Sequence, residues 1–242
     1  EVFVAEAARI LTSLEALRKS MQEIRLARTG NIRVGTTSTQ IVPELFAHVA
    51  AFRSQHPNIQ VQIVETAGSL SLTEMLVDGE VDAAFLIASA EDMPDERICF
   101  YPLIRGQVVL AVSDGHWLAG KSSIRLRDLS AESFIFPGRA LSMHSMALKL
   151  CRDAGFEPKI ACECDQVDTV LNFVASGNGI GFVSSQSLMK RARAGICVIP
   201  VEPVVERISC LAVAREKVGK PIVEMFRDFL LPAIAAQEAK RT

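Results

Sequence analysis

The stretch IQVQIVETAGSLSLTEMLVDGEVDAAFLI, residues 59 to 87, contains two strands with a short helix between them. Residues 59–65 alternate apolar and polar side chains, which is the pattern of a half-buried strand. Residues 70–77 form a helix that Asp78-Gly79 ends, and residues 81–87 form a continuous apolar strand. This strand–helix–strand unit predicts a mostly parallel sheet covered by helices.

The same alternation extends on both sides of this stretch. Upstream, residues 32–34 read as a strand and residues 42–55 as a helix with Leu45, Val49 and Phe52 facing inward. Downstream, strands and helices recur in the same order, over residues 134–137, 144–155, 159–165, 167–177 and 179–183. Because HPNIQVQI is echoed by EPKIACEC about 100 residues later, one α/β unit is used twice. Two such lobes commonly place a ligand cleft between them.

Residues 101–112 and 206–214 are apolar enough to be strands that cross between the lobes as a paired hinge. The helix at 221–237 returns to the first lobe. The predicted fold class is therefore α/β, with two Rossmann-like lobes and a hinge of two crossover strands. The predicted division gives residues 30–104 and 208–242 to lobe I and residues 105–207 to lobe II.

The first 29 residues predict a linker or dimerisation helix. Residues 1–28 contain no glycine or proline, and their apolar side chains are spaced alternately by four and three, as in a coiled coil. The members of this stripe are Phe3, Ala7, Ile10, Leu14, Leu17, Met21 and Ile24. An amphipathic helix lying on its own domain is the alternative.

The composition excludes several classes of protein. The 26 basic and 28 acidic residues give a net charge of -2 without a long run of one sign, so this chain lacks a strong electrostatic hold on nucleic acid or anionic lipid. No apolar stretch approaches the roughly 20 residues that span a bilayer, and the first residues lack the features of a signal peptide. The six cysteines form no CxxC pair or zinc pattern, so buried, reduced thiols in a cytoplasmic protein are expected, with no metal and no cofactor.

Four hydroxyl residues stand between the strand at 32–34 and the next helix: Thr36, Thr37, Ser38 and Thr39, followed by Gln40. In an open parallel sheet, ligands bind outside the carboxyl ends of strands and face helix N-termini. A helix N-terminus attracts anions, and hydroxyls can donate hydrogen bonds to a carboxylate or a sulfate. One helix cap needs one hydroxyl, so four favour a ligand loop over capping alone.

The other strand-to-helix junctions carry similar candidates. Ser69 or Ser71 could cap the helix at 70–77, and Ser69 could also donate into the cleft. Arg139 could bind a carboxylate, although an exposed surface arginine is an equal alternative. His144 is more simply explained as a structural histidine. Gln166 and Val167 occupy the last junction.

A series of motifs in this sequence, taken in their order along the chain, resembles the LysR-type transcriptional regulators, and the resemblance covers essentially the whole chain. They are TG-NIRVG, FRSQHPNIQVQI, GSLSLTEMLVDGEVDAAF, PLIRGQVVLAVSDGHWLAGK, GFEPKIACEC and VASGNGIGFVSS. The resemblance implies a linker helix and an effector-binding domain of the periplasmic-binding-protein type II kind. It also implies that a winged helix-turn-helix, absent from this chain, precedes Glu1 and binds promoter DNA. The implied assembly is a homodimer or homotetramer.

Within this family, TTSTQ at 36–40 is similar to the anion loop of the sulfur-assimilation regulators. There, residues matching Thr36, Thr39 and Gln40 help hold sulfate or a small acid, and in other branches residues matching Thr39 and Ser69 contact aromatic carboxylates. This chain departs from the family in two places. Ile87 stands where some aromatic-acid regulators have an arginine, and Ser184 stands where a proline is common, so the effector's identity stays open.

The candidate ligand-binding residues for a small anionic effector are Thr36, Thr37, Ser38, Thr39, Gln40, Gly68, Ser69, Arg139, Ser142, Met143, His144, Gln166, Val167 and Phe182. The alternative function is a periplasmic-type solute-binding protein for a small organic anion, which predicts an exported monomer. The heptad helix and the unpaired cysteines argue against that alternative. An enzyme is not expected, because no GxSxG, P-loop or HExxH motif occurs, and GNGIG at 177–181 precedes a strand rather than opening a helix.

Overall fold

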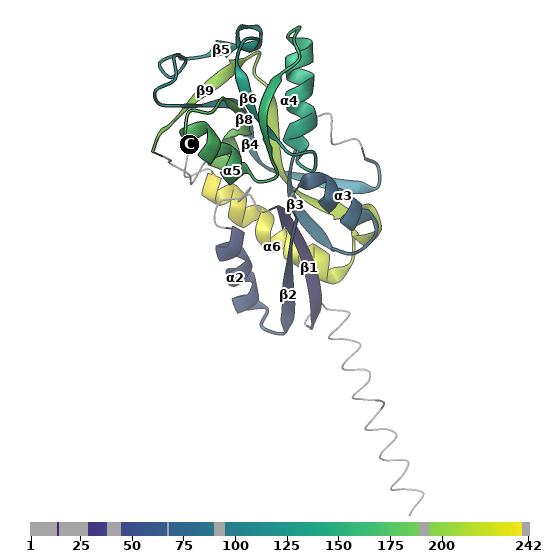
Figure 1. Ribbon diagram of the computed structural model, residues 1–242. Coiled ribbons are helices and arrows are strands. Elements are labelled where there is room, and N and C mark those ends of the chain that lie inside the picture. Colours follow the sequence, from purple (N-terminus) through teal and green to yellow (C-terminus); the bar gives the residue numbers. More distant parts are fainter. Residues whose placement is uncertain are drawn as a thin grey trace, which may run out of the picture.

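The computed structural model of this chain consists of two lobes joined by two long strands (Figure 1). The predicted linker helix, residues 1–29, lies outside the described residues except for positions 14 and 29. The described residues are 14, 29–37, 45–66, 68–89, 95–188 and 194–238.

The first lobe is the lower one in Figure 1. Its elements agree with the predicted strands and helices to within a few residues, and Leu45, Val49 and Phe52 are buried as expected. The elements are β1 (Gly30–Thr37), α2 (Leu45–Gln55), β2 (Ile59–Thr66), α3 (Ser69–Val77), β3 (Ala83–Ala88) and α6 (Pro221–Glu238).

The second lobe repeats the alternation of strands and helices. Its elements are β5 (Ile124–Arg125), β6 (Ser133–Pro137), α4 (Ser142–Asp153), β7 (Lys159–Cys164), α5 (Val167–Ala175), β8 (Gly181–Ser184) and β9 (Ile196–Glu202). Short 3-10 turns follow three of the strands: η1 (Leu126–Leu129), η2 (Ser185–Leu188) and η3 (Arg215–Lys217). The strands that join the lobes are β4 (Ile98–Ser113) and β10 (Glu206–Ala214), at the positions predicted for crossover strands.

An eight-stranded sheet runs through both lobes in the order β2-β1-β3-β10-β4-β9-β5, with β8 also paired to β4. β1 is parallel to β2 and β3, but β10 is antiparallel to both β3 and β4. The expectation of a mostly parallel sheet is therefore wrong for the middle of the molecule. The reason is that the chain leaves the first lobe along β4 and returns directly along β10, so these long strands run in opposite directions. β4 pairs with β10 as far as Gln107 and with β8 from Val108.

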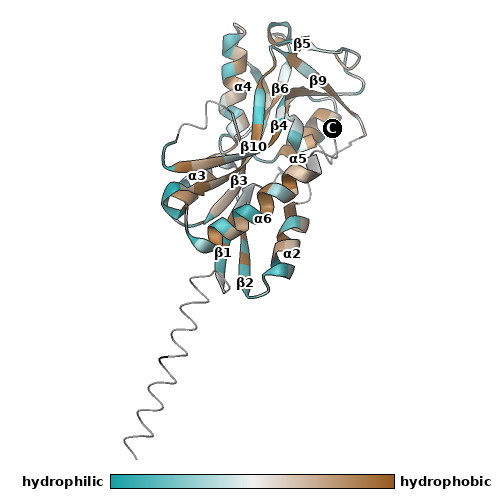
Figure 2. Ribbon diagram, turned by 180° about the vertical axis from the view of Figure 1, so that it is seen from behind, coloured by the Kyte–Doolittle hydropathy of each residue, from teal (hydrophilic) through white to brown (hydrophobic). Residues whose placement is uncertain are grey.

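The C-terminal helix α6 packs on the first lobe, as predicted (Figure 1). Val223, Phe226, Leu230 and Ile234 share a buried core with β1 and α2. The rings of Phe226 and Phe52 meet edge to face with their centroids 5.1 Å apart. Figure 2 shows brown apolar residues along the central strands β3 and β10, whereas the helices carry both brown and teal residues. The second lobe has its own core around Phe134 and Phe182, so each lobe is packed independently.

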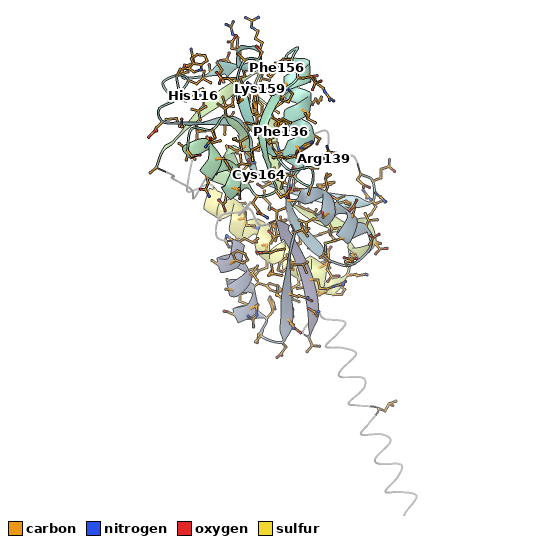
Figure 3. All side chains as sticks on the ribbon, viewed as in Figure 1. His116, Phe136, Arg139, Phe156, Lys159 and Cys164 are labelled. Carbon is orange, nitrogen blue, oxygen red and sulfur yellow. The ribbon has the colours of Figure 1, made fainter. Side chains whose placement is uncertain are left out.

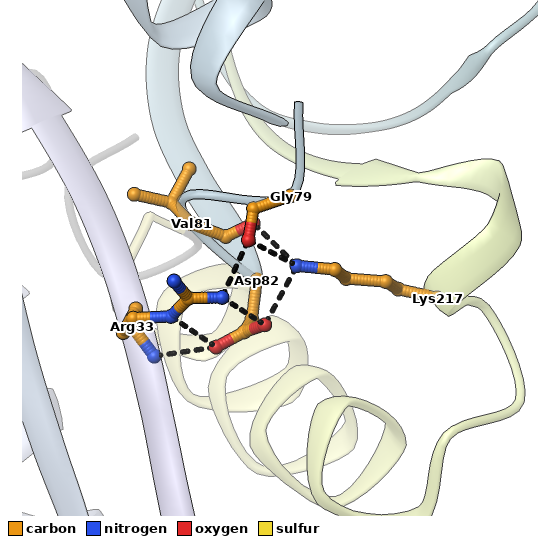
Figure 4. Close-up of polar contacts among 5 residues, drawn as sticks. All are labelled: Arg33, Gly79, Val81, Asp82 and Lys217. Atoms are coloured by element: carbon orange, nitrogen blue, oxygen red, sulfur yellow. Dashed lines mark hydrogen bonds and ion pairs between the residues drawn. The ribbon is translucent and has the colours of Figure 1, made fainter. Parts of the chain in front are cut away.

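A charged cluster ties β1 to the loop before β3 and to η3 (Figure 4). Lys217, 5% exposed, donates from Nζ to Asp82 Oδ1 at 2.7 Å and to the Val81 carbonyl at 2.8 Å. The backbone N–H of Arg33 donates to Asp82 Oδ2 at 2.8 Å. Burial would raise the pKa of Asp82, but the hydrogen bonds from Lys217 and Arg33 outweigh it and hold the pKa below 3.8. This cluster joins β1, the loop before β3 and η3. It lies at the opposite end of β3 from the cavity described below.

Candidate ligand-binding site

A cavity lies between the two lobes, where the ends of several strands and helices meet. It contains about 520 Å³ of space not filled by atoms, part of which is open to solvent. The described residues at its wall are Thr37, Gly68, Ser69, Ile87, Pro137, Leu141, Ser142, Met143, Val167, Val170, Phe182, Val183, Ser184, Ser187 and Arg207.

Three helices begin at this cavity. Ser69 is the first residue of α3, Ser142 the first of α4 and Val167 the first of α5, and all three residues are at the wall. The N-cap residues of α3 and α4 are Gly68 and Leu141, whose side chains have no acceptor to satisfy the first N–H groups. Because each helix N-terminus carries about half a positive charge, their convergence favours an anion in the cavity.

Arg207 adds a full positive charge to the same wall. It lies near the start of β10 and is only 1% exposed. Its Nη2 donates to Ser142 Oγ at 2.7 Å and to the Ile87 carbonyl at 3.3 Å, both of which are neutral acceptors. The other described wall residues carry no formal charge. Among the described wall residues, the groups that attract an anion are thus one guanidinium and three helix N-termini.

The backbone that carries Arg207 is held from the second lobe by Gln186, which is 2% exposed. Gln186 Nε2 donates to the Arg207 carbonyl at 2.8 Å and, more weakly, to the Ile104 carbonyl of β4 at 3.4 Å. Its Oε1 accepts a hydrogen bond from Ser184, one of the cavity residues. A single buried amide therefore links η2 to both crossover strands beside the cavity. Gly106 leaves the necessary room, since a Cβ there would lie 2.3 Å from the Gln186 side chain.

The structure brings many of the predicted residues together at the cavity. Those at its wall are Thr37, Gly68, Ser69, Ser142, Met143, Val167 and Phe182. Ser38, Thr39 and Gln40, the rest of the predicted hydroxyl loop, lie outside the described residues. Thr36 is buried, but its side chain points to the opposite face of β1 from Thr37, because side chains alternate along a strand. The predicted cap of α3 is also corrected: Gly68 is the N-cap, and Ser69 is already helical.

Three other predicted residues are not at the cavity wall. Arg139 is exposed in the loop before α4, at the end of the second lobe that faces the first (Figure 3). His144 turns away because α4 begins at Ser142, two residues earlier than predicted, and its Nδ1 lies 2.8 Å from the Pro137 carbonyl. Gln166 is exposed as the N-cap of α5, and it is the next residue, Val167, that reaches the cavity.

The most important residue missed by the sequence reasoning is Arg207. The sequence feature that could have indicated this residue is an arginine inside a largely apolar crossover strand, ERISCLAVA. The guanidinium of Arg207 reaches the carbonyl of Ile87 in the neighbouring strand, β3. The apolar wall residues were missed because strand and helix patterns predict burial without indicating which buried residues face a cavity. The other missed residues are Ile87, Pro137, Leu141, Val170, Val183, Ser184 and Ser187.

All six cysteines are free thiols, but only Cys151, Cys164 and Cys210 are buried, whereas the others are half-buried. Burial raises the pKa of Cys151 and Cys210 to about 12 and that of Cys164 to about 11. These thiols therefore stay protonated and unreactive near neutral pH. Within the part of the chain that the structure describes, no group of three or more His, Cys, Asp or Glu residues could hold a metal ion. No helix among those residues is long and apolar enough to cross a membrane.

The lobes touch at Gly68, beside the cavity. Gly68 has an extended backbone, with φ of -151°, that any residue can adopt, but an added Cβ would lie 1.8 Å from the carbonyl oxygen of Ala140 in the second lobe. We expect Gly68→Ala to force the lobes apart there and to weaken effector binding about 10- to 100-fold, the cost of overpacking by about 1–3 kcal/mol. Calorimetric titration measures this loss.

Gly120→Ala is the matched control, since a Cβ at Gly120 meets no described atom within 4 Å. Equal effector affinities for the two variants would show that the contact at Gly68 does not govern the cavity. Circular dichroism melts of both variants separate loss of binding from loss of folding.

The chain belongs to the LysR substrate binding domain family, whose model matches residues 27–235. It is the effector-binding domain of a LysR-type regulator. The relatives include an uncharacterized HTH-type transcriptional regulator, YwbI, of Bacillus subtilis, 28% identical over 76% of this chain and 60% of the relative. HTH-type transcriptional regulator TtuA of Agrobacterium vitis is 28% identical over 81% of this chain and 64% of the relative. The chain thus spans less than two thirds of the length of these regulators.

Solved structures share the fold. The effector-binding domain of QuiR in complex with shikimate has a TM-score of 0.72 at 24% identity, covering 85% of this chain and 97% of that one. The regulatory domain of Synechocystis CcmR in complex with 2-PG has a TM-score of 0.75 at 21% identity, covering 85% of this chain and 98% of that one. These neighbours confirm the predicted two-lobed α/β fold.

Proposed function

We propose that this chain senses a small anionic effector, which binds in the cavity between the lobes. The observation that carries the proposal is Arg207, a buried guanidinium at the wall of a cavity whose other described residues are neutral. The three helix N-termini at the same wall also attract an anion. The shikimate bound to one structural neighbour is itself a carboxylate, which supports an organic anion as the effector.

Binding of an anion would change the balance between arrangements of the lobes. Thr37 and Ser69 belong to the first lobe, Ser142 belongs to the second, and Arg207 lies on a strand that joins them. An anion that contacts residues of both lobes favours the arrangement in which all of them reach it. Gln186 of the second lobe donates to the Arg207 carbonyl, so a movement of Arg207 also changes how the second lobe holds the crossover strand β10.

In the proposed full-length protein, this change is passed to a DNA-binding domain that precedes the chain. The segment at 1–29 serves as linker and dimerisation helix, and residues 30–104 with 208–242 and residues 105–207 form the two lobes. The assembly is a cytoplasmic homodimer or homotetramer that binds promoter DNA and does not act as an enzyme. The matched relatives support this proposal, since they are named as HTH-type transcriptional regulators.

A thermal-shift panel tests the proposal on this chain. Each carboxylic acid, including shikimate and benzoate, is paired with its neutral amide, and sulfate and phosphate are added. A ligand at 100 times its dissociation constant adds about 2.7 kcal/mol of stability, which raises the melting temperature of a domain this size by roughly 5–11 °C. We expect at least one anion to produce such a shift and its neutral counterpart to produce none.

Arg139→Ala serves as the control for nonspecific charge effects, because Arg139 is exposed and outside the cavity wall. It should leave the shift unchanged. If no anion in the panel shifts the melting temperature of the folded chain, or if amides and acids act equally, the proposal of an anionic effector is wrong.

A further inference from the structure

Two cysteine side chains lie next to each other on a strand of the second lobe (Figure 3). Cys162 and Cys164 both belong to β7, and their Sγ atoms are 3.7 Å apart. Among the described strands, β7 pairs with β6 alone, so it is an edge strand. Cys164 is 6% exposed and Cys162 is half-buried, which leaves one of the two thiols in contact with solvent.

The strand holds the two thiols at this spacing. Side chains two residues apart point to the same face of a strand, and here that face packs on the apolar core that β7 shares with α5. Cys162 is paired with Ile135 of β6. Cys164 is paired with Pro137, and its carbonyl accepts a hydrogen bond from the Gly138 N–H at 2.8 Å. The two sulfurs are therefore presented together by regular backbone structure.

This geometry suits an atom placed between the sulfurs better than a direct bond between them. A disulfide would require the sulfurs to approach by about 1.6 Å. The two Cα atoms, which are two residues apart on one strand, are separated by about 6.6 Å, near the upper limit for a disulfide. By contrast, an atom bonded to both sulfurs at about 2.3 Å would have an S–X–S angle of about 107°, which is close to tetrahedral.

The number of donors decides which kind of atom fits. A structural zinc site takes four protein ligands. In the part of the chain that the structure describes, no group of three or more His, Cys, Asp or Glu residues could complete such a site. Soft ions select thiol ligands. Trivalent arsenic is such a centre, and it needs only two protein thiols when its third position carries an oxygen or a carbon group.

We propose that Cys162 and Cys164 form a binding site for trivalent arsenicals, namely arsenous acid and monosubstituted organoarsenicals. With an oxide R–As=O, two As–S bonds form, the As=O bond breaks, and the oxygen leaves as water with both thiol protons. Arsenic stays trivalent, so no oxidant or reductant takes part. The half-buried Cys162 reacts first, and Cys164, which is unreactive alone, closes the ring in an intramolecular step. The described wall of the cavity between the lobes includes neither cysteine.

Intact-mass spectrometry of the folded chain with phenylarsine oxide tests the proposal. The chain is kept reduced with a phosphine, which supplies no competing thiol. We expect one phenylarsenic group per chain, gained with the loss of one water. Cys162→Ser and Cys164→Ser should each weaken binding at least 100-fold, because a second, linked contact raises affinity by about 10²- to 10⁴-fold.

Cys197→Ser is the matched control, since Cys197 is also half-buried but lies on β9. It should bind the arsenical like the unaltered chain. Competition distinguishes binding by two thiols from binding by one. The dithiol 2,3-dimercaptopropanol should remove the arsenical, whereas an equal concentration of 2-mercaptoethanol should not.

The contrary outcomes are clear. If Cys162→Ser binds as tightly as the unaltered chain, or if the folded, reduced chain gains no phenylarsenic group, the proposal is wrong. If Zn²⁺ binds as tightly as phenylarsine oxide and both are lost in Cys162→Ser, the pair is a divalent cation site and the arsenical class is wrong. If Cys164→Ser does not fold by circular dichroism, Cys162→Ser at its half-buried position decides alone.

Discussion

Arg207→Met is expected to weaken effector binding by roughly 30- to 1,000-fold, because removing one partner of a buried, hydrogen-bonded charge pair costs about 2–4 kcal/mol. Methionine keeps an apolar chain of similar length at the wall but removes the guanidinium that donates to Ser142 Oγ. The loss should appear chiefly as faster dissociation of the complex. Titration calorimetry on the purified variant measures it.

Two further variants test the interpretation of that loss. Arg207→Lys keeps the positive charge but not the planar fork of donors, and it should bind with intermediate affinity. Arg105→Met removes an arginine from the adjacent strand β4, where the side chain is 74% exposed and pairs with Glu206 at 3.4 Å. It should bind like the unaltered chain. Equal losses for the variants at 105 and 207 would mean that long-range charge, rather than contact in the cavity, governs binding.

The largest expected effect on stability is that of Asp82→Ala. The substitution leaves the ammonium of Lys217, whose side chain is only 6% exposed, without its carboxylate partner. Breaking a buried pair in this way lowers the free energy of unfolding by about 3 kcal/mol or more, a fall of roughly 6–12 °C in melting temperature. Urea or thermal unfolding of the chain measures the difference.

Asp128→Ala provides the matched control for this prediction. Asp128 is 37% exposed and pairs with Arg125 at 3.2 Å, so its loss should cost less than about 1 kcal/mol. Adding Lys217→Met to Asp82→Ala should recover part of the lost stability, because the buried ammonium is then gone as well. If both variants lose the same free energy of unfolding, the cluster in Figure 4 contributes no more to stability than an exposed ion pair does.

The same cluster predicts a dependence of stability on pH. Because the pKa of Asp82 in the folded chain lies below its ordinary value of 3.8, the carboxylate stabilises the fold fully above that value. Its contribution is lost as the pH falls through the lowered pKa. The difference in unfolding free energy between the unaltered chain and Asp82→Ala should therefore be constant from pH 5 to 7 and shrink below about pH 3.8. A difference that grows in acid would contradict the assignment.

The fold was predictable because each element has a local signal. The alternating strand at 59–65, the helix with Leu45, Val49 and Phe52 inward, and the recurrence of this order in the second lobe all appear in the structure. The direction of the crossover strands was not predictable in this way. It depends on how two distant segments, β4 and β10, pair with each other, and apolar composition does not encode that pairing.

The candidate site was predictable where backbone topology decides position. Thr37, Ser69, Ser142 and Val167 all stand at ends of strands or starts of helices, and the parallel arrangement within each lobe brings such ends together. Arg207 was missed because it lies within a strand, where a long side chain usually points to solvent. Only its contact with Ile87 and Ser142, which lie 120 and 65 residues away in the chain, reveals that it reaches the cavity.

The central claim is that a small anion binds between the lobes against Arg207, and a crystal structure of this chain with 4-bromobenzoate tests it most directly. The anomalous signal of bromine locates the apolar end of the ligand independently of the carboxylate. We predict bromine inside the cavity between the lobes, with the carboxylate about 2.7–2.9 Å from the guanidinium of Arg207. Bromine at any other place, or a carboxylate turned away from Arg207, would contradict the account.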